Sequence, residues 1–294
     1  MYELIQVGER SYYINCPVKM GIFLLGNHEV CLIDSGNDKD AGKKILKILA
    51  SNGWTLKMIL NTHSHADHIG GNRFLQQRTG CRAYTAGIDR AFSEFPVLEP
   101  SLLYGGFPCK ALRNKFLCAQ ESEAEALTEE ILPEGLSLMR IDGHSPAMAA
   151  FKTCDGVWFL GDCLTSGAII EKYPVSYIYD VRNYLETLEA VKKLEGKLFI
   201  PAHAEPTENI VPLADLNASK VEEICSLLLC LCRKPSAPDE ILKAVFDHYA
   251  LTMDFSQYVL VGSTVRSYLS YLHEEGSLSA DFENNKLYWT TIKK

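Results

Sequence analysis

One short segment of the chain concentrates residue types that bind metal ions. Three of the eight histidines, His63, His65 and His68, lie with Asp67 in the stretch NTHSHADHIGG. In an extended chain His63, His65 and Asp67 point to one side and His68 to the other. His68 can join the group only if the backbone turns into a helix there, and the two glycines that follow permit such a turn. We therefore expect a strand end that curls into a helix, with four side chains converging.

The donor atoms of this segment indicate the kind of ion. Imidazole nitrogen and carboxylate oxygen suit zinc best, with iron and manganese as alternatives, and fit calcium or magnesium less well. Four donors so close in sequence have too little freedom to enclose one ion tetrahedrally, so the segment predicts two adjacent divalent ions. The alternative is a polar loop whose histidines only form hydrogen bonds, and the clustering disfavours it.

Two ions need further ligands, and three segments offer them. His144 in RIDGHSPAM, Asp162 in VWFLGDCL and His203 in KLFIPAHAEP each come just after or at the end of an apolar run typical of a strand. A rigid strand presents such residues to a cleft. Each one alone has an ordinary reading as a turn residue, but together with the opening segment they form a candidate ligand set.

The stretch THSHADH (residues 62–68) resembles the His-x-His-x-Asp-His signature of the metallo-β-lactamase superfamily. The resemblance covers roughly residues 1–212 and implies an αββα sandwich with the site at one edge of the paired sheets. It implies one ion held by His63, His65 and His144, a second held by Asp67, His68 and His203, and Asp162 bridging both. LIDSG is similar to the family's early Asp-x-Gly turn, so Asp34 is expected to support the ligands from behind.

The chain departs from the family pattern in two places. Ser145 stands where the family often has Thr, and Ala202 precedes the last ligand where Gly is common. Neither change removes a ligand, although both leave the loop geometry open.

The expected function is that of a metal-dependent hydrolase. Two ions about 3.5–4 Å apart lower the pKa of a shared water and supply hydroxide at neutral pH. Asp67 is the candidate catalytic residue, which orients this nucleophile and accepts its proton. We find no G-x-S-x-G elbow, P-loop or G-x-G-x-x-G motif in the sequence. The expected substrate is a small molecule with an ester, thioester or lactone carbonyl.

Three other functions stay open at this point: a nuclease, a mononuclear iron enzyme acting on sulfur substrates, and a nucleic-acid-binding regulator. The irregular segment 95–133 contains Tyr104, Lys110 and Arg113, which could hold an apolar acyl group or an anionic tail. An ordinary surface loop explains these residues equally well.

The elements that must position these residues follow from short patterns. Before the irregular segment, strand-like runs cover SYYIN, GIFLLG, EVCLID, KMILNT and CRAYTA, with helical patterns at DKDAGKKILKILASNG and NRFLQQRTG. Inside it, the acidic stretch QESEAEALTEEIL has a helical pattern. After it come the strands LSLMRIDG, MAAFKT and VWFLGD, the helix VRNYLETLEAVKKLEG and the strand KLFIPAH. The fold class is therefore α+β, in layers.

The pattern changes near residue 212, which gives two expected domains, a catalytic domain over residues 1–212 and a second domain over 213–294. Three helical patterns followed by a hairpin with its turn at residues 283–285 is the order of a winged helix. From residue 211 onward eight Lys or Arg face eleven Asp or Glu. DNA-binding modules usually carry a basic stripe, so a structural or substrate-capping role is the favoured one.

The overall composition is that of an average globular protein, with 294 residues, 47% hydrophobic residues and a net charge of −8. The negative charge makes nucleic acid or an anionic membrane a poor partner. Ten scattered cysteines without a CxxC pair, and the lack of a signal-peptide pattern, favour a reduced, cytoplasmic chain. A homodimer is expected only because it is the commonest assembly.

Overall fold

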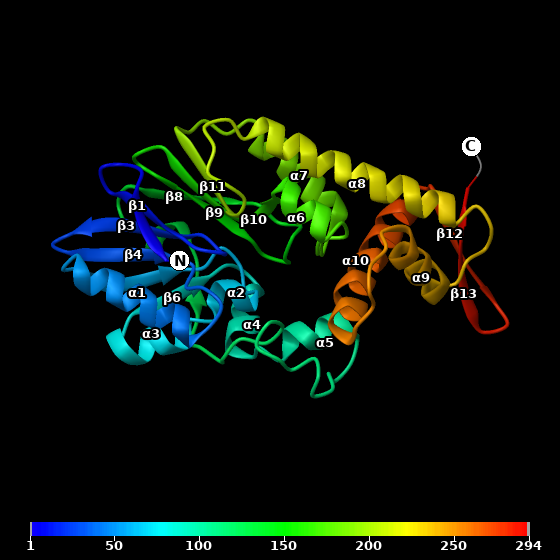
Figure 1. Ribbon diagram of the computed structural model, residues 1–294, viewed down its shortest axis with the longest axis horizontal. Coiled ribbons are helices and arrows are strands. Elements are labelled where there is room, and N and C mark those ends of the chain that lie inside the picture. The colour runs from blue at the N-terminus through cyan, green and yellow to red at the C-terminus, as the bar shows by residue number, and fades with distance from the viewer. Residues whose placement is uncertain (1, 293–294) are drawn as a thin grey trace.

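The computed structural model describes residues 2–292, and two β-sheets form its larger part (Figure 1). The first sheet contains, in spatial order, β1 (Glu3–Gln6), β2 (Ser11–Asn15), β3 (Met20–Gly26), β4 (Glu29–Ile33), β5 (Thr55–Leu60), β6 (Arg82–Thr85) and β7 (Glu125–Ala126). The second contains β11 (Leu198–His203), β10 (Val157–Thr165), β9 (Ala149–Thr153) and β8 (Leu136–Arg140). Strands β1–β4 pair antiparallel and strands β4–β7 pair parallel. The histidine-rich segment follows β5 and therefore lies in the parallel half of the sheet.

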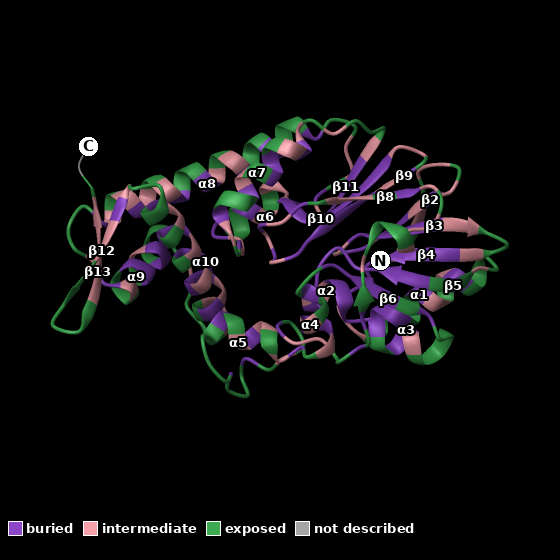
Figure 2. Cartoon of the chain, turned by 180° about the vertical axis from the view of Figure 1, so that it is seen from behind, coloured by how far each residue is buried: buried purple, intermediate pink, exposed green. Residues whose placement is uncertain are grey.

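Three buried clusters show that these sheets lie in a four-layer stack. Between the sheets, Phe23 and Leu60 of the first sheet pack with Phe151 and Phe159 of the second. The other face of the first sheet packs against helices α1 (Lys39–Ser51) and α3 (Asn72–Thr79). The other face of the second sheet packs against α7 (Val181–Val191) and α8 (Val211–Leu231). The expected αββα sandwich is confirmed, and Figure 2 shows its strands as the most buried part of the chain.

Local sequence explains why these elements form. Helix α1 begins after Asp38, whose side chain accepts hydrogen bonds from two backbone N–H groups of the first turn, as a good N-cap does. Its buried stripe contains Ile45 and Leu49, which are one helical turn apart. Strand β10 is covered on both faces and is buried from Val157 to Leu164, which accounts for its almost continuous apolar sequence.

Shorter helices connect these layers: α2 (Ala66–Ile69), α4 (Asp89–Glu94), α5 (Leu98–Tyr104) and α6 (Gly167–Lys172). The strands and long helices expected from sequence are confirmed, whereas the helix expected over the acidic stretch at residues 120–132 is wrong. That stretch supplies β7, which pairs with the free edge of β6, and a single 3-10 turn at Glu129–Ile131. Backbone pairing at an open sheet edge, together with burial of Leu127 and Ile131 against the inter-sheet core, outweighs the local helical pattern.

The C-terminal part contains α8, α9 (Pro238–His248) and α10 (Phe255–Glu274), followed by the hairpin of β12 (Leu278–Glu283) and β13 (Lys286–Thr291). The hairpin turn lies where the sequence placed it. Asn284 and Asn285 have φ of 51° and 62°, which this residue type tolerates in tight hairpins. Helix α8 begins at Val211, next to the expected boundary at residue 212, and extends from the sandwich to the hairpin (Figure 1).

Two general properties concern the whole described chain. No helix within residues 2–292 is long and apolar enough to cross a membrane. All ten cysteines are free thiols.

Candidate metal centre

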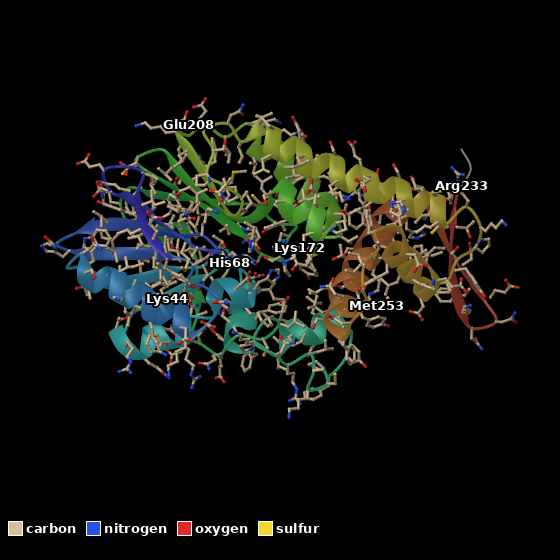
Figure 3. All side chains as sticks on the ribbon, viewed as in Figure 1. Lys44, His68, Lys172, Glu208, Arg233 and Met253 are labelled. Atoms are coloured by element: carbon tan, nitrogen blue, oxygen red, sulfur yellow. The ribbon has the colours of Figure 1, made fainter. Side chains whose placement is uncertain are left out.

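The seven residues that the sequence offered as ligands come together at one edge of the sandwich. They belong to the segment after β5, the turn between β8 and β9, the middle of β10 and the end of β11. His68 lies in the interior, on the side that faces α6 and the C-terminal helices (Figure 3). The expected curl is confirmed, because the chain leaves β5 at Leu60 and enters α2 at Ala66, with His65 as its N-cap.

The first group comprises His63, His65, His144 and Asp162. The Nδ1 atom of His65 lies 3.0 Å from Nε2 of His63 and 3.0 Å from Nε2 of His144. Asp162 Oδ2 lies 3.6 Å from Nε2 of His144 and 3.9 Å from Nε2 of His63. Two nitrogens bound tetrahedrally to zinc at about 2.0–2.1 Å would be about 3.3 Å apart, so the spacing fits ligands that point at one centre.

The second group comprises Asp67, His68, Asp162 and His203. His203 Nε2 lies 3.3 Å from Asp67 Oδ2 and 3.2 Å from Asp162 Oδ2, and His68 Nε2 lies 3.0 Å from Asp162 Oδ1. His68 Nε2 and Asp162 Oδ1 are both buried. Although they lie 3.0 Å apart, they do not form a hydrogen bond, and neither has another hydrogen-bond partner among the described residues. Buried polar atoms without a partner are costly, and a bound cation would satisfy both. Asp162 belongs to both groups, as a bridging ligand requires.

Hydrogen bonds on the far side of the rings fix which nitrogen faces each group. Nδ1 of His68 lies 2.8 Å from Asp34 Oδ2, and Nδ1 of His144 lies 3.0 Å from the carbonyl oxygen of Tyr177. Both partners are acceptors, so both Nδ1 atoms carry the proton and donate. The Nε2 atoms are then free to bind a cation, an arrangement common among metal-binding histidines.

The pKa values of the histidines also differ between the two groups. Burial, followed by the neighbouring His68 and His65, holds the pKa of His63 far below its usual value. Burial and His144 lower the pKa of His65 to about 3. In the second group burial opposes the charged form, but the carboxylate of Asp162 outweighs it and raises the pKa of His203 to about 10. The first group thus offers neutral nitrogen donors, and the second pairs its histidines with carboxylates.

Asp34 supports the second group from behind, as expected. Its Oδ2 accepts hydrogen bonds from Thr62 Oγ1 (2.7 Å) and His68 Nδ1 (2.8 Å), and its Oδ1 accepts one from Thr62 N (2.8 Å). The two glycines after His68 are required by close backbone contacts. A Cβ atom at Gly70 would lie 2.3 Å from the backbone of Asn37, and one at Gly71 would lie 2.3 Å from the carbonyl oxygen of Ser35.

Sequence reasoning missed two carboxylates of this centre. Asp89 is buried at the start of α4 and accepts hydrogen bonds from Ser64 N, Ser64 Oγ, Ser145 Oγ and Ala147 N. It thereby joins the loop of His63 and His65 to the loop of His144. Burial raises the pKa of Asp89 to about 6, although these donors act against the rise.

The other missed carboxylate is Glu99 in α5. Its Oε1 lies 3.5 Å from Nε2 of His65, and its side chain is only 12% exposed. Burial, then the charges of Asp89 and Asp67, raise the pKa of Glu99 to about 8. No local sequence pattern predicts a role for Glu99, because it is a single acidic residue in a short helix of an irregular segment.

The residues suggested for substrate binding lie further along that segment. Tyr104 packs its ring against Phe255 of α10, and the guanidinium of Arg113 lies over the ring of Phe107. Lys110 and Arg113 are exposed. None of these contacts involves the histidine cluster, so their role in binding stays a prediction. Tyr177, in contrast, places its ring 5.3 Å from the ring of His65.

Comparison with known proteins places this geometry in context. The family model described as the metallo-beta-lactamase superfamily matches residues 21–203. A hydroxyacylglutathione hydrolase of Methylococcus capsulatus is 48% identical over 46 residues, which are 16% of this chain and 18% of that protein. The chain thus spans less than a fifth of the length of this curated relative. A second protein of that name, from Prochlorococcus marinus, is 24% identical over 207 residues, or 69% of this chain and 73% of its own length.

Solved structures extend the likeness to the whole fold. A beta-lactamase domain protein from Burkholderia ambifaria aligns with 99% of this chain and 94% of its own, with a TM-score of 0.75 and 16% identity. At that identity the likeness concerns the fold alone. It includes the C-terminal helices as well as the sandwich, because almost the entire chain is aligned.

Proposed function

Since the chain belongs to the metallo-beta-lactamase superfamily, we propose that it is a hydrolase that uses two divalent metal ions to cleave an ester, thioester or lactone. One observation carries the proposal: two groups of ligand-type side chains converge within the same cluster and share Asp162. Zinc is the proposed ion because histidine nitrogen and carboxylate oxygen make up the whole donor set. The relatives named hydroxyacylglutathione hydrolase favour a thioester of a small thiol as the substrate.

Each residue has a proposed part in this chemistry. His63, His65 and His144 would hold one ion, Asp67, His68 and His203 would hold the other, and Asp162 belongs to both groups. Ions of this kind supply a nucleophilic water at neutral pH by lowering its pKa. Asp67 has the most exposed carboxylate of the cluster, with 38% of its side chain accessible. Its second oxygen can orient the attacking water and accept its proton.

The C-terminal residues 213–294 are proposed to form a winged-helix-like domain with a structural or capping role. Their three helices and hairpin follow the order of that fold. The exposed side of α10 is not basic, because it carries Glu274 as well as Arg266. This composition supports a small-molecule enzyme over a nucleic-acid-binding regulator.

The experiment is a comparison of three acyl substrates with the zinc-loaded protein. We expect hydrolysis of a hydroxyacyl thioester of glutathione, and slower cleavage of an aryl ester and a γ-lactone. Asp67→Asn should lower kcat by about 10²–10⁴-fold, the range that a positioned acid or base contributes. Glu171→Gln, an exposed change on α6, serves as the control. Equal activity of Asp67→Asn and the parent, or no cleavage of any of the three substrates, would contradict the proposal.

A further inference from the structure

Glu99 is a largely buried carboxylate whose position the proposed reaction does not yet explain. Its Oε1 lies 3.5 Å from Nε2 of His65, which is longer than the about 2.7–3.2 Å usual for a hydrogen bond, so the two atoms face each other without a formed hydrogen bond. The other ring nitrogen of His65, Nδ1, is the one that lies 3.0 Å from both His63 and His144. Glu99 therefore stands behind His65, on the side opposite to the other two histidines.

This placement has a consequence for the proton of His65. A neutral imidazole carries one proton, and the nitrogen that binds a metal must be the bare one. If Nδ1 binds the ion, the proton sits on Nε2, where it needs an acceptor because the ring is largely buried. Glu99 places an acceptor oxygen 3.5 Å from this nitrogen, whereas Asp34 and the carbonyl oxygen of Tyr177 lie within hydrogen-bond distance of His68 and His144.

The helix that carries Glu99 is held by the C-terminal helix α10. Leu103 of α5 is fully buried in a cluster with Val259 of α10, and Tyr104 packs its ring against Phe255. Arg266 of α10 donates a hydrogen bond from Nη2 to the carbonyl oxygen of Leu103 at 3.1 Å. Figure 1 shows α5 against the end of α10, apart from the body of the sandwich. The C-terminal part of the chain thus fixes where Glu99 stands.

Helix α10 also reaches the backbone behind His144. Ser267 donates from Oγ to the carbonyl oxygen of Tyr179 at 2.8 Å. Tyr179 N and Asp180 N both donate to the carbonyl oxygen of Gly143, the residue before His144. The same helix therefore supports the surroundings of two histidines of the first group, from two directions.

We propose that Glu99 is a positioning residue that orients His65 for metal binding, and that α10 holds it in place through Leu103 and Arg266. The inference rests on the proposed function in that it assigns His65 to a metal ion. It also gives the C-terminal helices a role: α10 holds the helix that carries Glu99.

The test measures metal affinity, by competition of the intact protein with a chromophoric chelator for zinc. Glu99→Leu removes the acceptor at similar size and should weaken the binding of one zinc ion about 10–100-fold, the usual effect of removing a partner behind a ligand. Glu99→Gln keeps one acceptor oxygen and should retain affinity between that of the parent and that of Glu99→Leu. Arg266→Gln should show a smaller loss than Glu99→Leu. The matched control is Glu94→Leu on neighbouring α4, where the acid pairs with Arg90 at the surface.

Stability separates positioning from a merely structural role. In the metal-free protein Glu99→Leu should unfold at a urea concentration no lower than the parent, because an apolar side chain replaces a buried acid. The proposal would be overturned if Glu99→Leu bound zinc as tightly as Glu94→Leu. It would also be overturned if Glu99→Gln and Glu99→Leu lost zinc affinity equally and both were less stable than the parent without metal.

The same experiment keeps this proposal apart from the proposed hydrolysis. If the parent binds zinc but cleaves no acyl substrate, the hydrolase proposal fails, and the affinities of the Glu99 variants still decide the positioning role. If the parent hydrolyses a thioester and Glu99→Leu matches it in affinity, kcat and KM, only the role of Glu99 is refuted.

Discussion

A single carboxylate, Asp34, orients one histidine of the cluster, His68. It sits just after β4 with a φ of 61° and uses both oxygens, one toward Thr62 N and the other toward Thr62 Oγ1 and His68 Nδ1. An amide in its place would turn one of these acceptors into a donor that faces another donor. The position therefore demands a carboxylate, which explains why an acid is buried there.

Replacement of Asp34 by asparagine should accordingly weaken the second metal-binding group selectively. We expect the affinity for one of two zinc ions to fall about 10–100-fold, while the first group keeps its affinity. Chelator competition resolves the two binding steps. An unchanged second step in Asp34→Asn would show that His68 needs no such support.

Asp38 illustrates a residue that serves the fold and not the site. Its carboxylate caps α1 by accepting hydrogen bonds from Asp40 N and Ala41 N. Burial acts to raise the pKa of Asp38, but the hydrogen bonds from Ala41 and Lys115 outweigh it and hold the pKa below its usual value. Because the folded-state pKa is lowered, this contribution is present above about pH 4 and is lost as the pH falls further.

Asp38→Ala should therefore lower the free energy of unfolding by about 1 kcal/mol at pH 7, with a smaller difference from the parent at pH 3. Urea denaturation at both pH values measures this. A difference that grows toward low pH would contradict the capping role, and zinc affinity should not change at either site.

Among single residues, the sequence predicted the ligands that are close together along the chain and missed the carboxylates that reach the site only through folding. His63, His65, Asp67 and His68 are recognisable because six consecutive positions contain them. Glu99 and Asp89 approach the histidines only after the chain has folded, and each is a lone acid in its own segment. Spacing along the chain therefore carries no information about either of them.

Among the elements, the turn before β9 most directly sets the position of a proposed ligand. Gly143 has a φ of 123°, and a Cβ atom there would lie 2.3 Å from the backbone nitrogen of Tyr184 in α7. Thr187 of the same helix donates to the carbonyl oxygen of Asp142 at 2.8 Å. Helix α7 is thus in direct contact with the turn that contains His144.

Gly143→Ala should move this turn, with a loss of zinc from the first group and a loss of stability. Gly53→Ala is the matched control, because Gly53 also has positive φ (68°) but has open space where a Cβ would stand. The control should cost about 1–2 kcal/mol from backbone strain alone and leave zinc binding intact. Equal costs in the two variants, with zinc retained in both, would mean that contact with α7 is unimportant.

Element prediction from sequence succeeded where burial follows a regular period and failed where an edge was available. The buried stripe of α1 and the apolar run of β10 were visible in advance. The acidic stretch was expected to be a helix, but Glu125 and Ala126 pair with β6 instead. The presence of an unpaired edge on β6 is a property of the assembled sheet, which no local pattern contains.

For the whole molecule, one buried cluster spans the expected domain boundary. It includes Trp158 of β10 and Leu188 of α7, and continues through Leu228 of α8 and Tyr268 of α10 to Leu278 of β12. Helix α8 therefore covers the second sheet at one end and packs with the C-terminal helices at the other. Such shared burial favours one cooperative folding unit over two independent ones.

A chain ended at residue 210 should accordingly fail to fold stably, since it loses α8 and exposes the apolar face of α7. We expect a single thermal transition for the full chain, and for the shortened chain no cooperative transition and a tendency to aggregate. Differential scanning calorimetry tests both. A shortened chain with a sharp transition would support the independent catalytic domain over residues 1–212 that the sequence suggested.

The central claim is that two metal ions share the cluster around Asp162, and the metal content of the purified protein tests it most directly. After zinc is supplied and excess is dialysed away, we expect about two ions per chain, the number that a two-metal site holds. His68→Ala should retain about one, because the first group of ligands stays complete. A parent that retains no stoichiometric metal, or a His68→Ala variant that binds as much as the parent, would contradict the account.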